Sequence, residues 1–180
     1  MKINLFVILA ILICCFTSCR NNKTSSDSMQ PIDGYPLIDD INVIRQILEA
    51  KCLDTIEFKK GEVIADIGAG NGTLEAMLSI FHDSLSFYIQ DIDTSVCNQD
   101  AINRVVSFYA NVRKQPFTNN FFSVTGGDYK TNLPNDKFDK ILMLWTFQYL
   151  KYPESIMSDL RLKLKPDGLM YVINPDVDFE

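Results

Sequence analysis

From Leu37 onward, short apolar runs alternate with stretches in which apolar residues recur every three or four positions. Ile41, Ile44, Ile47 and Leu48 have this helical spacing, which predicts an amphipathic helix over about 38–53. The same spacing predicts further helices over 71–82, 95–113 and 154–164. The apolar runs between the helices predict five strands, at 62–67, 85–90, 121–125, 140–145 and 169–173, with a turn at Pro166-Asp167-Gly168 before the last.

Strands that are apolar throughout and alternate with helices are typical of a parallel sheet covered on both faces. We therefore predict an α/β fold in residues 37–180, a doubly wound and mainly parallel sheet with right-handed crossovers. Ligands of such sheets bind beyond the carboxyl ends of the strands. The strand-to-helix corners are the positions at which chemistry is expected.

Residues 1–36 have a different pattern. Lys2 precedes an apolar run over 5–16, which suits the central region of a signal peptide and is too short to cross a bilayer. Thr17-Ser18-Cys19 resembles the lipobox of bacterial lipoproteins, which implies a signal peptide at 1–18, lipidation of Cys19 and a protein facing away from the cytoplasm. The polar residues 19–36 are expected to be a tether. An ordinary signal peptide or an uncleaved anchor are the alternatives, and without any signal the protein would be cytoplasmic.

Composition narrows the function classes. Apolar residues make up 47% and charged residues 22% of the chain, as in globular proteins, and the formal net charge is −6. The acidic balance argues against binding to a nucleic-acid backbone. His82 is the only histidine, so no histidine-rich metal site is expected, and its place near the end of a predicted helix favours a helix-end role. Outside the predicted signal and lipidation site, Cys52 and Cys97 either form a disulfide or are free thiols.

Three acidic residues follow three predicted strands. The first, Asp66, opens the segment Asp66-Ile67-Gly68-Ala69-Gly70-Asn71-Gly72, whose glycines let a ligand approach the backbone before a helix begins. The second, Asp91, lies about 20 residues further on, where a carboxylate can accept hydrogen bonds from ribose hydroxyls. The third, Asp128, is followed by Tyr129 and can accept a hydrogen bond from the amino group of a base.

The ordered set of motifs resembles class I S-adenosylmethionine-dependent methyltransferases. The matching segments are VIADIGAGNG at 63–72, YIQDID at 88–93, GDYKTNLPNDKFD at 127–139, FDKILMLWTFQYLKYPE at 138–154 and LRLKLKPDGLMYVINP at 160–175. The resemblance covers about residues 40–175 and implies S-adenosylmethionine as the cofactor of a Rossmann-like methyltransferase fold.

By this resemblance, Asp66 and the turn Gly68, Ala69, Gly70, Asn71 and Gly72 would hold the methionine end of the cofactor. Asp91 would bind the ribose, Ile92 would contact the adenine ring, and Asp128 with Tyr129 would lie at the adenine amino group. The alternative for each aspartate is a helix cap or turn former. A helix cap is the preferred interpretation for Asp93, and Asp139 can be explained as a turn residue before the fourth strand.

Methyl transfer from a sulfonium needs alignment and desolvation of the reactants, and it needs no metal. No catalytic residue is assigned from the sequence. The segment 145–149, at the end of the fourth strand, is the candidate position for an unidentified acceptor. Trp145, Gln148 and Tyr149 are its candidate contacts, but packing is the preferred interpretation for Trp145 and Phe147.

Three functions compete at this point. The leading hypothesis is a membrane-tethered methyltransferase, and the second is a non-catalytic lipoprotein that uses the cofactor fold as a binding or structural module. The third is a nicotinamide-dependent oxidoreductase, against which the G-x-G-x-G spacing and Asp128 count.

The resembled family normally continues beyond the fifth strand with a helix and a strand hairpin. Here Pro175 is followed by five residues, so we expect the fifth strand to be an exposed apolar edge. Either a partner chain covers that edge, or the chain is a truncated product or a fragment.

Overall fold

The computed structural model describes residues 36–174 of the chain. The predicted signal peptide, the lipidation site at Cys19 and the predicted tether up to residue 35 lie outside the described residues. Across 36–174, no helix has both the length and the apolar composition needed to span a membrane.

Helices and strands alternate along the chain as predicted, with ends that differ by a few residues. The elements are α2 (Ile41–Ala50), η2 (Leu53–Thr55), β1 (Val63–Ile67), α3 (Thr73–Leu78), β2 (Ser86–Asp91), α4 (Gln99–Arg113), β3 (Asn120–Thr125), β4 (Phe138–Leu144), η3 (Phe147–Tyr149), α5 (Pro153–Lys163) and β5 (Leu164–Ile173).

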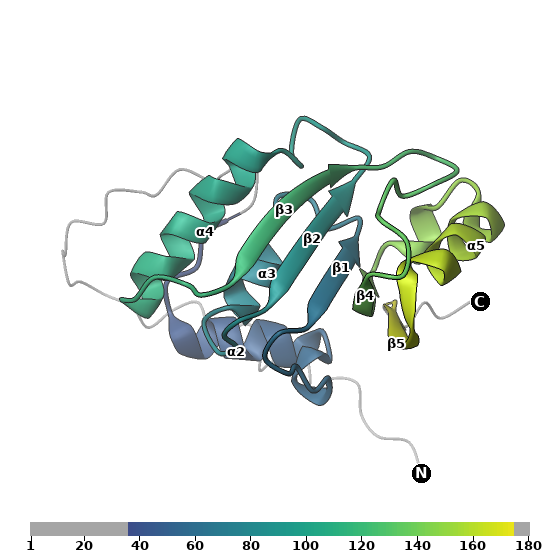
Figure 1. The fold of residues 1–180 in the computed structure, drawn as a ribbon. Helices are drawn as coiled ribbons and strands as arrows, with labels where there is room; N and C mark the ends of the chain where they lie inside the picture. Colours follow the sequence, from purple (N-terminus) through teal and green to yellow (C-terminus); the bar gives the residue numbers. More distant parts are fainter. Residues whose placement is uncertain (1–35, 175–180) are drawn as a thin grey trace, which may run out of the picture.

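The five described strands form one sheet in the order β3-β2-β1-β4-β5, and every neighbouring pair is parallel (Figure 1). Successive side chains of a strand point to opposite faces of the sheet, so they pack into two different cores. Ile64 packs with α2, α3 and α4 on one face, whereas Ala65 and Ile67 pack with Ile156 and Leu160 of α5 on the other. The predicted α/β sheet with both faces covered is confirmed.

Two predicted elements have different limits in the structure. The predicted helix 71–82 is α-helical only over Thr73–Leu78, because the backbone then tightens into i→i−3 bonds, from the Ile80 amide to Met77 and from the Phe81 amide to Leu78. The predicted turn at Pro166-Asp167-Gly168 lies within β5 rather than before it. Four residues of β5, 165–168, face a single residue of β4, so the turn is a bulge in a continuous strand.

Asp139 also corrects a sequence-based interpretation. It lies inside β4 and is not a turn residue before that strand. Its carboxylate accepts a hydrogen bond from the Val63 amide at 2.8 Å and pairs with the Lys165 ammonium, with both oxygens at 2.8 Å. It therefore ties the start of β1 to the bulge of β5.

The outer edge of β5 pairs with no other strand among residues 36–174. Leu169 and Val172 on this strand are exposed, and so is Leu162 at the end of α5. An exposed apolar edge of this kind can pair with a further strand.

Candidate functional site

The glycine-rich turn leaves β1 at the carboxyl edge of the sheet. Gly68, Gly70 and Gly72 all have positive φ, at 72°, 58° and 76°. At Gly68 the close approach of Thr146 adds a second constraint, because a Cβ would lie 2.4 Å from Cγ2 of Thr146. The turn is thus folded against the segment that follows β4, and only glycine fits there without a shift.

Asp91 links this turn to the end of β2. One oxygen of its carboxylate accepts a hydrogen bond from the Gly70 amide at 3.0 Å, and the other accepts from the Asp93 amide at 3.0 Å. Each oxygen keeps a further lone pair for an added donor. Asp93 itself accepts hydrogen bonds from the amide and hydroxyl of Ser95 at 2.9 Å and 2.6 Å and so forms a turn. The helix cap preferred for it from the sequence is wrong for α4, whose N-cap is Asn98.

Two cavities open at this edge. The first, the β2-side cavity, has a volume of about 330 Å³, and its lining includes Ile67, Gly68, Gln90, Asp91, Ile92, Gly127, Leu144, Trp145, Thr146, Tyr149, Leu150 and Ile156. The second, the α2-side cavity, has a volume of about 320 Å³, and its lining includes Pro36, Ile38, Ile47, Lys51, Gly68, Ala69, Asn71, Thr73, Leu74, Met77, Leu144 and Trp145. Gly68, Leu144 and Trp145 line both, so the two cavities adjoin across the turn.

Trp145 stands between the cavities in a conformation that is rare for its residue type. Its φ is +62°, in the left-handed region, and its side chain is 43% exposed. The Lys51 ammonium lies 3.5 Å from the centre of the indole ring, a cation–π contact that joins α2 to the end of β4. Backbone strain of this kind is frequent at functional sites.

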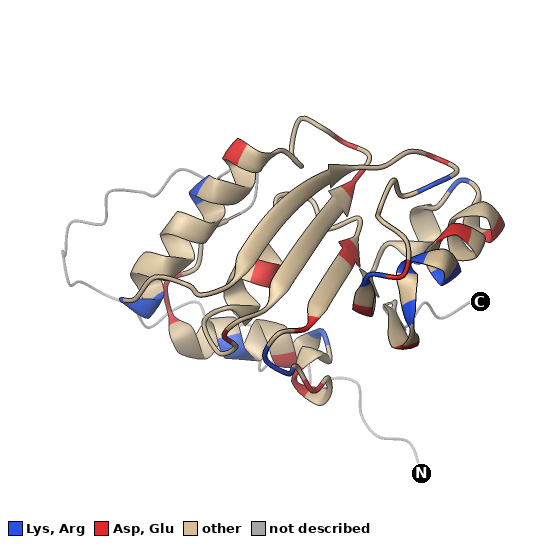
Figure 2. Ribbon diagram, in the orientation of Figure 1, with Lys and Arg blue, Asp and Glu red and all other residues tan. Residues whose placement is uncertain are grey.

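Two buried acids lie behind the glycine turn. Asp66, at the end of β1, is 3% exposed, and Glu75, on α3, is fully buried. Burial raises the pKa of both carboxyls, and for Asp66 the nearby Glu75 carboxyl raises it further. Figure 2 shows acidic positions on α3 and at the ends of β1 and β2, the edge at which the predicted ligand would lie. In the described chain no group of three potential metal ligands is found, and Cys52 and Cys97 are free.

The structure does not bring the side chains of Asp128 and Tyr129 into the lining of either cavity. The Asp128 carboxylate pairs with the Lys151 ammonium at 3.3 Å. Tyr129 is exposed, and its ring stacks on Tyr152 with the ring centres 4.2 Å apart. In the segment that follows β3, Gly127 rather than Asp128 or Tyr129 lines the β2-side cavity.

The candidate acceptor contacts are divided in the same way. Trp145 and Tyr149 line the β2-side cavity, whereas Phe147 and Gln148, in η3, line neither cavity. His82 packs edge-on against Phe58, with the ring centres 5.1 Å apart, and its amide donates to the Leu78 carbonyl. His82 therefore lies at the end of the α3 segment and outside both cavities, as expected for a helix-end residue.

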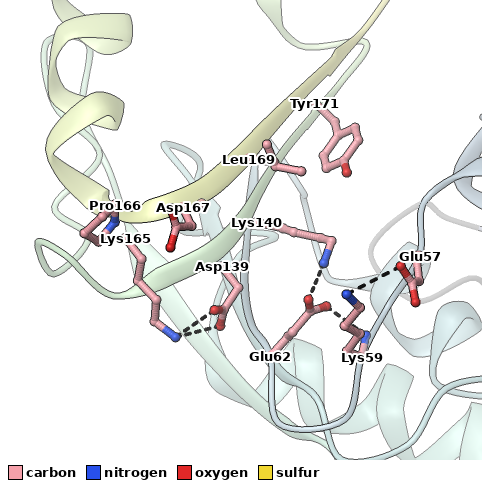
Figure 3. Close-up of a pocket in the computed structure, with 11 residues that line it drawn as sticks. Glu57, Lys59, Glu62, Asp139, Lys140, Lys165, Pro166, Asp167, Leu169 and Tyr171 are labelled. Carbon is pink, nitrogen blue, oxygen red and sulfur yellow. Dashed lines mark hydrogen bonds and ion pairs between the residues drawn. The ribbon is translucent and has the colours of Figure 1, made fainter.

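A cavity of about 430 Å³ lies at the opposite, amino edge of the sheet (Figure 3). Its lysines are held by acids: Lys140 pairs with Glu62, Lys165 with Asp139, and Lys59 with Glu57. The first two pairs join the start of β1, β4 and β5, whereas the third lies within the segment before β1. Because each ammonium in the lining has a carboxylate partner, this cavity is best explained as part of the strand connections, and its volume alone does not make it the functional site.

Sequence reasoning missed Lys51 and Glu75, and it did not predict the contact between Thr146 and Gly68. Glu75 could have been noticed, because it stands next to Ala76 and Met77 in a short helix that is buried. Carboxylates are seldom buried without a partner group. Lys51 and Thr146 come from segments distant in sequence, and only the fold brings Lys51 into the α2-side cavity and Thr146 against Gly68.

A model of the methyltransferase domain family matches residues 42–180. Among solved structures, an S-adenosylmethionine-dependent methyltransferase from Aquifex aeolicus has 21% identity and a TM-score of 0.54, covering 78% of this chain and 77% of its own. An arsenic(III) S-adenosylmethionine methyltransferase from Chlamydomonas reinhardtii has 15% identity and a TM-score of 0.50, covering 72% of this chain and 47% of its own.

A chain of the Haloferax volcanii complex between the Trm112 methyltransferase activator and a methyltransferase has 15% identity and a TM-score of 0.52. It covers 73% of this chain and 55% of its own. The protein thus spans about half the length of the Chlamydomonas and Haloferax chains. A sequence search of curated proteins found no match. At these identities the structural likenesses concern the fold.

Proposed function

The chain belongs to the methyltransferase domain family, and on that premise we propose that it transfers a methyl group from S-adenosylmethionine to an acceptor at the carboxyl edge of β1, β2 and β4. The observation that carries this proposal is the pair of adjoining cavities on either side of Gly68 and Trp145. One offers a carboxylate beside an apolar side chain, and the other offers a cation.

The β2-side cavity fits the nucleoside end of the cofactor. Both oxygens of Asp91 accept one backbone hydrogen bond each and can accept another from a ribose hydroxyl. Ile92 is exposed at the rim and offers an apolar side to a base. Gly127 lets a planar ring approach the backbone without meeting a Cβ.

The α2-side cavity fits the methionyl end, which carries one carboxylate and one ammonium. The Lys51 ammonium in its lining is a suitable partner for the carboxylate. Burial lowers the pKa of Lys51 while the charge of Asp66 raises it, so the two groups interact. Negative charge at Asp66 favours the ammonium at the same end.

Bound S-adenosylmethionine supplies an electrophilic methyl group on its sulfonium. The protein's own residues orient the two ends and shield the reacting region from water. We place the acceptor contact at Trp145 and Tyr149, whose aromatic side chains are 43% and 78% exposed. No base is assigned, since the described lining offers no histidine near these residues.

The test of this function is a calorimetric ligand series on the protein. We expect S-adenosylmethionine and S-adenosylhomocysteine to bind in the micromolar range and NAD to give no heat. 5′-Methylthioadenosine, which lacks the amino-acid portion, should bind at least tenfold more weakly, because it forgoes a charge-assisted contact with Lys51.

The matched variant for this series is Lys51→Met, which keeps most of the length of the side chain and removes its charge. It should weaken S-adenosylhomocysteine binding and leave methylthioadenosine binding unchanged. Absence of binding by every adenosine ligand would contradict the methyltransferase proposal. Binding without transfer to any acceptor in membrane extracts or small-molecule pools would support the non-catalytic module instead.

We further propose that lipidated Cys19 anchors the protein to a membrane, facing away from the cytoplasm. Its support is the sequence alone: the apolar run at 5–16, the small residues before Cys19 and the polar segment after it.

A partner chain at β5 is the third part of the proposal. The unpaired outer edge of β5 with exposed Leu169 and Val172 supports it, as does the complex of the Haloferax neighbour with an activator.

One fractionation experiment tests both of these proposals. The full-length protein should sediment with membranes, and Cys19→Ala should not incorporate labelled palmitate. After detergent extraction, light scattering should give a protein mass above that of one chain, and Val172→Lys should reduce it to one chain. A soluble, unlabelled wild-type protein would contradict the anchor, and a single-chain mass would contradict the partner.

A further inference from the structure

Glu75 is an ionisable residue in the core of the protein, with no cation beside it in the described residues. Its side chain is fully buried on α3, between Leu74 and the buried Ala76. Apart from its own amide and the neighbouring Asp66 carboxyl, no group of the described residues is placed to hydrogen-bond its carboxyl oxygens. An ionised carboxylate in such surroundings would be strongly unfavourable, so the group has to hold or share a proton.

The neighbour with which Glu75 can share a proton is Asp66. The two carboxyls are within hydrogen-bonding reach, and Oδ1 of Asp66 has no other partner in the described part of the chain. Two adjacent buried carboxyls cannot both ionise at low cost. One proton between them satisfies an oxygen of each and leaves the pair with a single negative charge.

Two groups from other parts of the chain act on this pair, one at the end of α2 and one before α4. Lys51 of α2 is the cation that acts on Asp66. Cys97, before α4, donates its thiol to the Ile89 carbonyl at 3.3 Å, and burial raises its pKa to about 11, so it is neutral. Cys97 also lies near Asp91 of β2, whose carboxylate accepts hydrogen bonds from the Gly70 and Asp93 amides. Among these, Lys51 faces the α2-side cavity, in which the methionyl end is proposed to bind.

We propose that Glu75 is a positioning residue for the methionyl end of the cofactor: it shares one proton with Asp66, so that Asp66 is held in place and the pair presents one negative charge to the cofactor's ammonium. This inference rests on the proposed function and concerns two buried residues, neither of which lines a cavity, so the pair acts on the ammonium through its charge. Glu75 acts through Asp66 and makes no contact with the cofactor itself.

The test compares wild type, Glu75→Gln and Glu75→Leu by S-adenosylhomocysteine titration between pH 6 and pH 9. In wild type, loss of the shared proton as the pH rises leaves two repelling carboxylates, so affinity should fall at least tenfold. Glu75→Gln supplies a permanent amide donor to Asp66. It should bind within threefold of wild type at pH 6 and lose less affinity as the pH rises. The ligand's own amine titrates in the same way with both proteins. The difference between their two pH profiles therefore reports the titration of the Asp66–Glu75 pair alone.

Glu75→Leu removes the proton donor and should bind at least tenfold more weakly at pH 6 while remaining folded. Equal pH profiles of wild type and Glu75→Gln, or wild-type affinity in Glu75→Leu, would overturn the inference.

A ligand-free measurement separates failure of this inference from failure of the proposed function. The raised pKa of Glu75 means that its burial costs least below its unfolded pKa and progressively more as the pH rises toward the folded value. The difference in urea midpoint between Glu75→Gln and wild type should therefore change in favour of Glu75→Gln as the pH rises from 4 to 8. A constant difference would contradict the shared proton even if no cofactor binds.

Discussion

Asp91→Ala is expected to weaken binding of S-adenosylhomocysteine by about 100-fold or more. A hydrogen bond to a charged group contributes about 1.5–3 kcal/mol, and the proposed ribose contact uses two of them. Since 1.4 kcal/mol corresponds to a tenfold change in affinity, the loss of both gives about two orders of magnitude. The substitution also removes the acceptor of the Gly70 and Asp93 amides, which shape the turn around the ligand.

Calorimetric titration of S-adenosylhomocysteine measures this effect, with Asp100→Ala as the matched control. Asp100 is an exposed carboxylate in the first turn of α4, so its loss changes the net charge equally and leaves the cavity lining intact. We expect the control to bind within twofold of wild type. A dissociation constant of Asp91→Ala within threefold of wild type would remove Asp91 from the site.

Gly68→Ala should have the second large effect, on both folding and binding. A side chain at a φ of +72° costs about 1–2 kcal/mol, and the overlap with Thr146 adds a packing cost of about 1–3 kcal/mol. We therefore expect the free energy of unfolding to fall by about 2–5 kcal/mol. The shift of the turn should also abolish measurable binding, because Gly68 lines both cavities.

Gly61→Ala separates the two contributions to that loss. Gly61 has a φ of +89° and nothing within 4 Å of the position of a Cβ, so its substitution tests backbone strain without a clash. Urea unfolding should show a loss of about 1–2 kcal/mol there, with cofactor binding retained. If Gly61→Ala and Gly68→Ala lost the same stability, the contact with Thr146 would contribute nothing.

The parts of the site that could be predicted from the sequence are those coded by consecutive residues. A strand followed by Gly68, Gly70 and Gly72 can fold in few ways, and parallel pairing of β1 with β2 then brings Asp91 to the same edge. The structure joins the two corners by the hydrogen bond from the Gly70 amide to Asp91. The α/β fold followed from the same alternation of apolar runs and helical spacing.

The residues that could not be predicted depend on packing between distant segments. Lys51 reaches Trp145 because α2 packs beside the end of β4, and no local pattern specifies that contact. The place of Asp128 after β3 predicts an adenine contact, and that contact stays a prediction. In the structure its carboxylate pairs with Lys151 and does not line either cavity. The triplet Pro166-Asp167-Gly168 predicts a turn, whereas the structure has a bulge in β5. The sequence does not distinguish the two, because the same residue types favour both.

Trp145 is the only tryptophan of the chain, and it lies where the two cavities adjoin. Its indole is partly exposed and has the Lys51 ammonium on its face, so its fluorescence depends on the contents of both cavities and on that charge. Any molecule that enters either side displaces water from the ring or moves the ammonium. The intrinsic fluorescence of Trp145 can therefore be used to screen acceptors for binding without an added label.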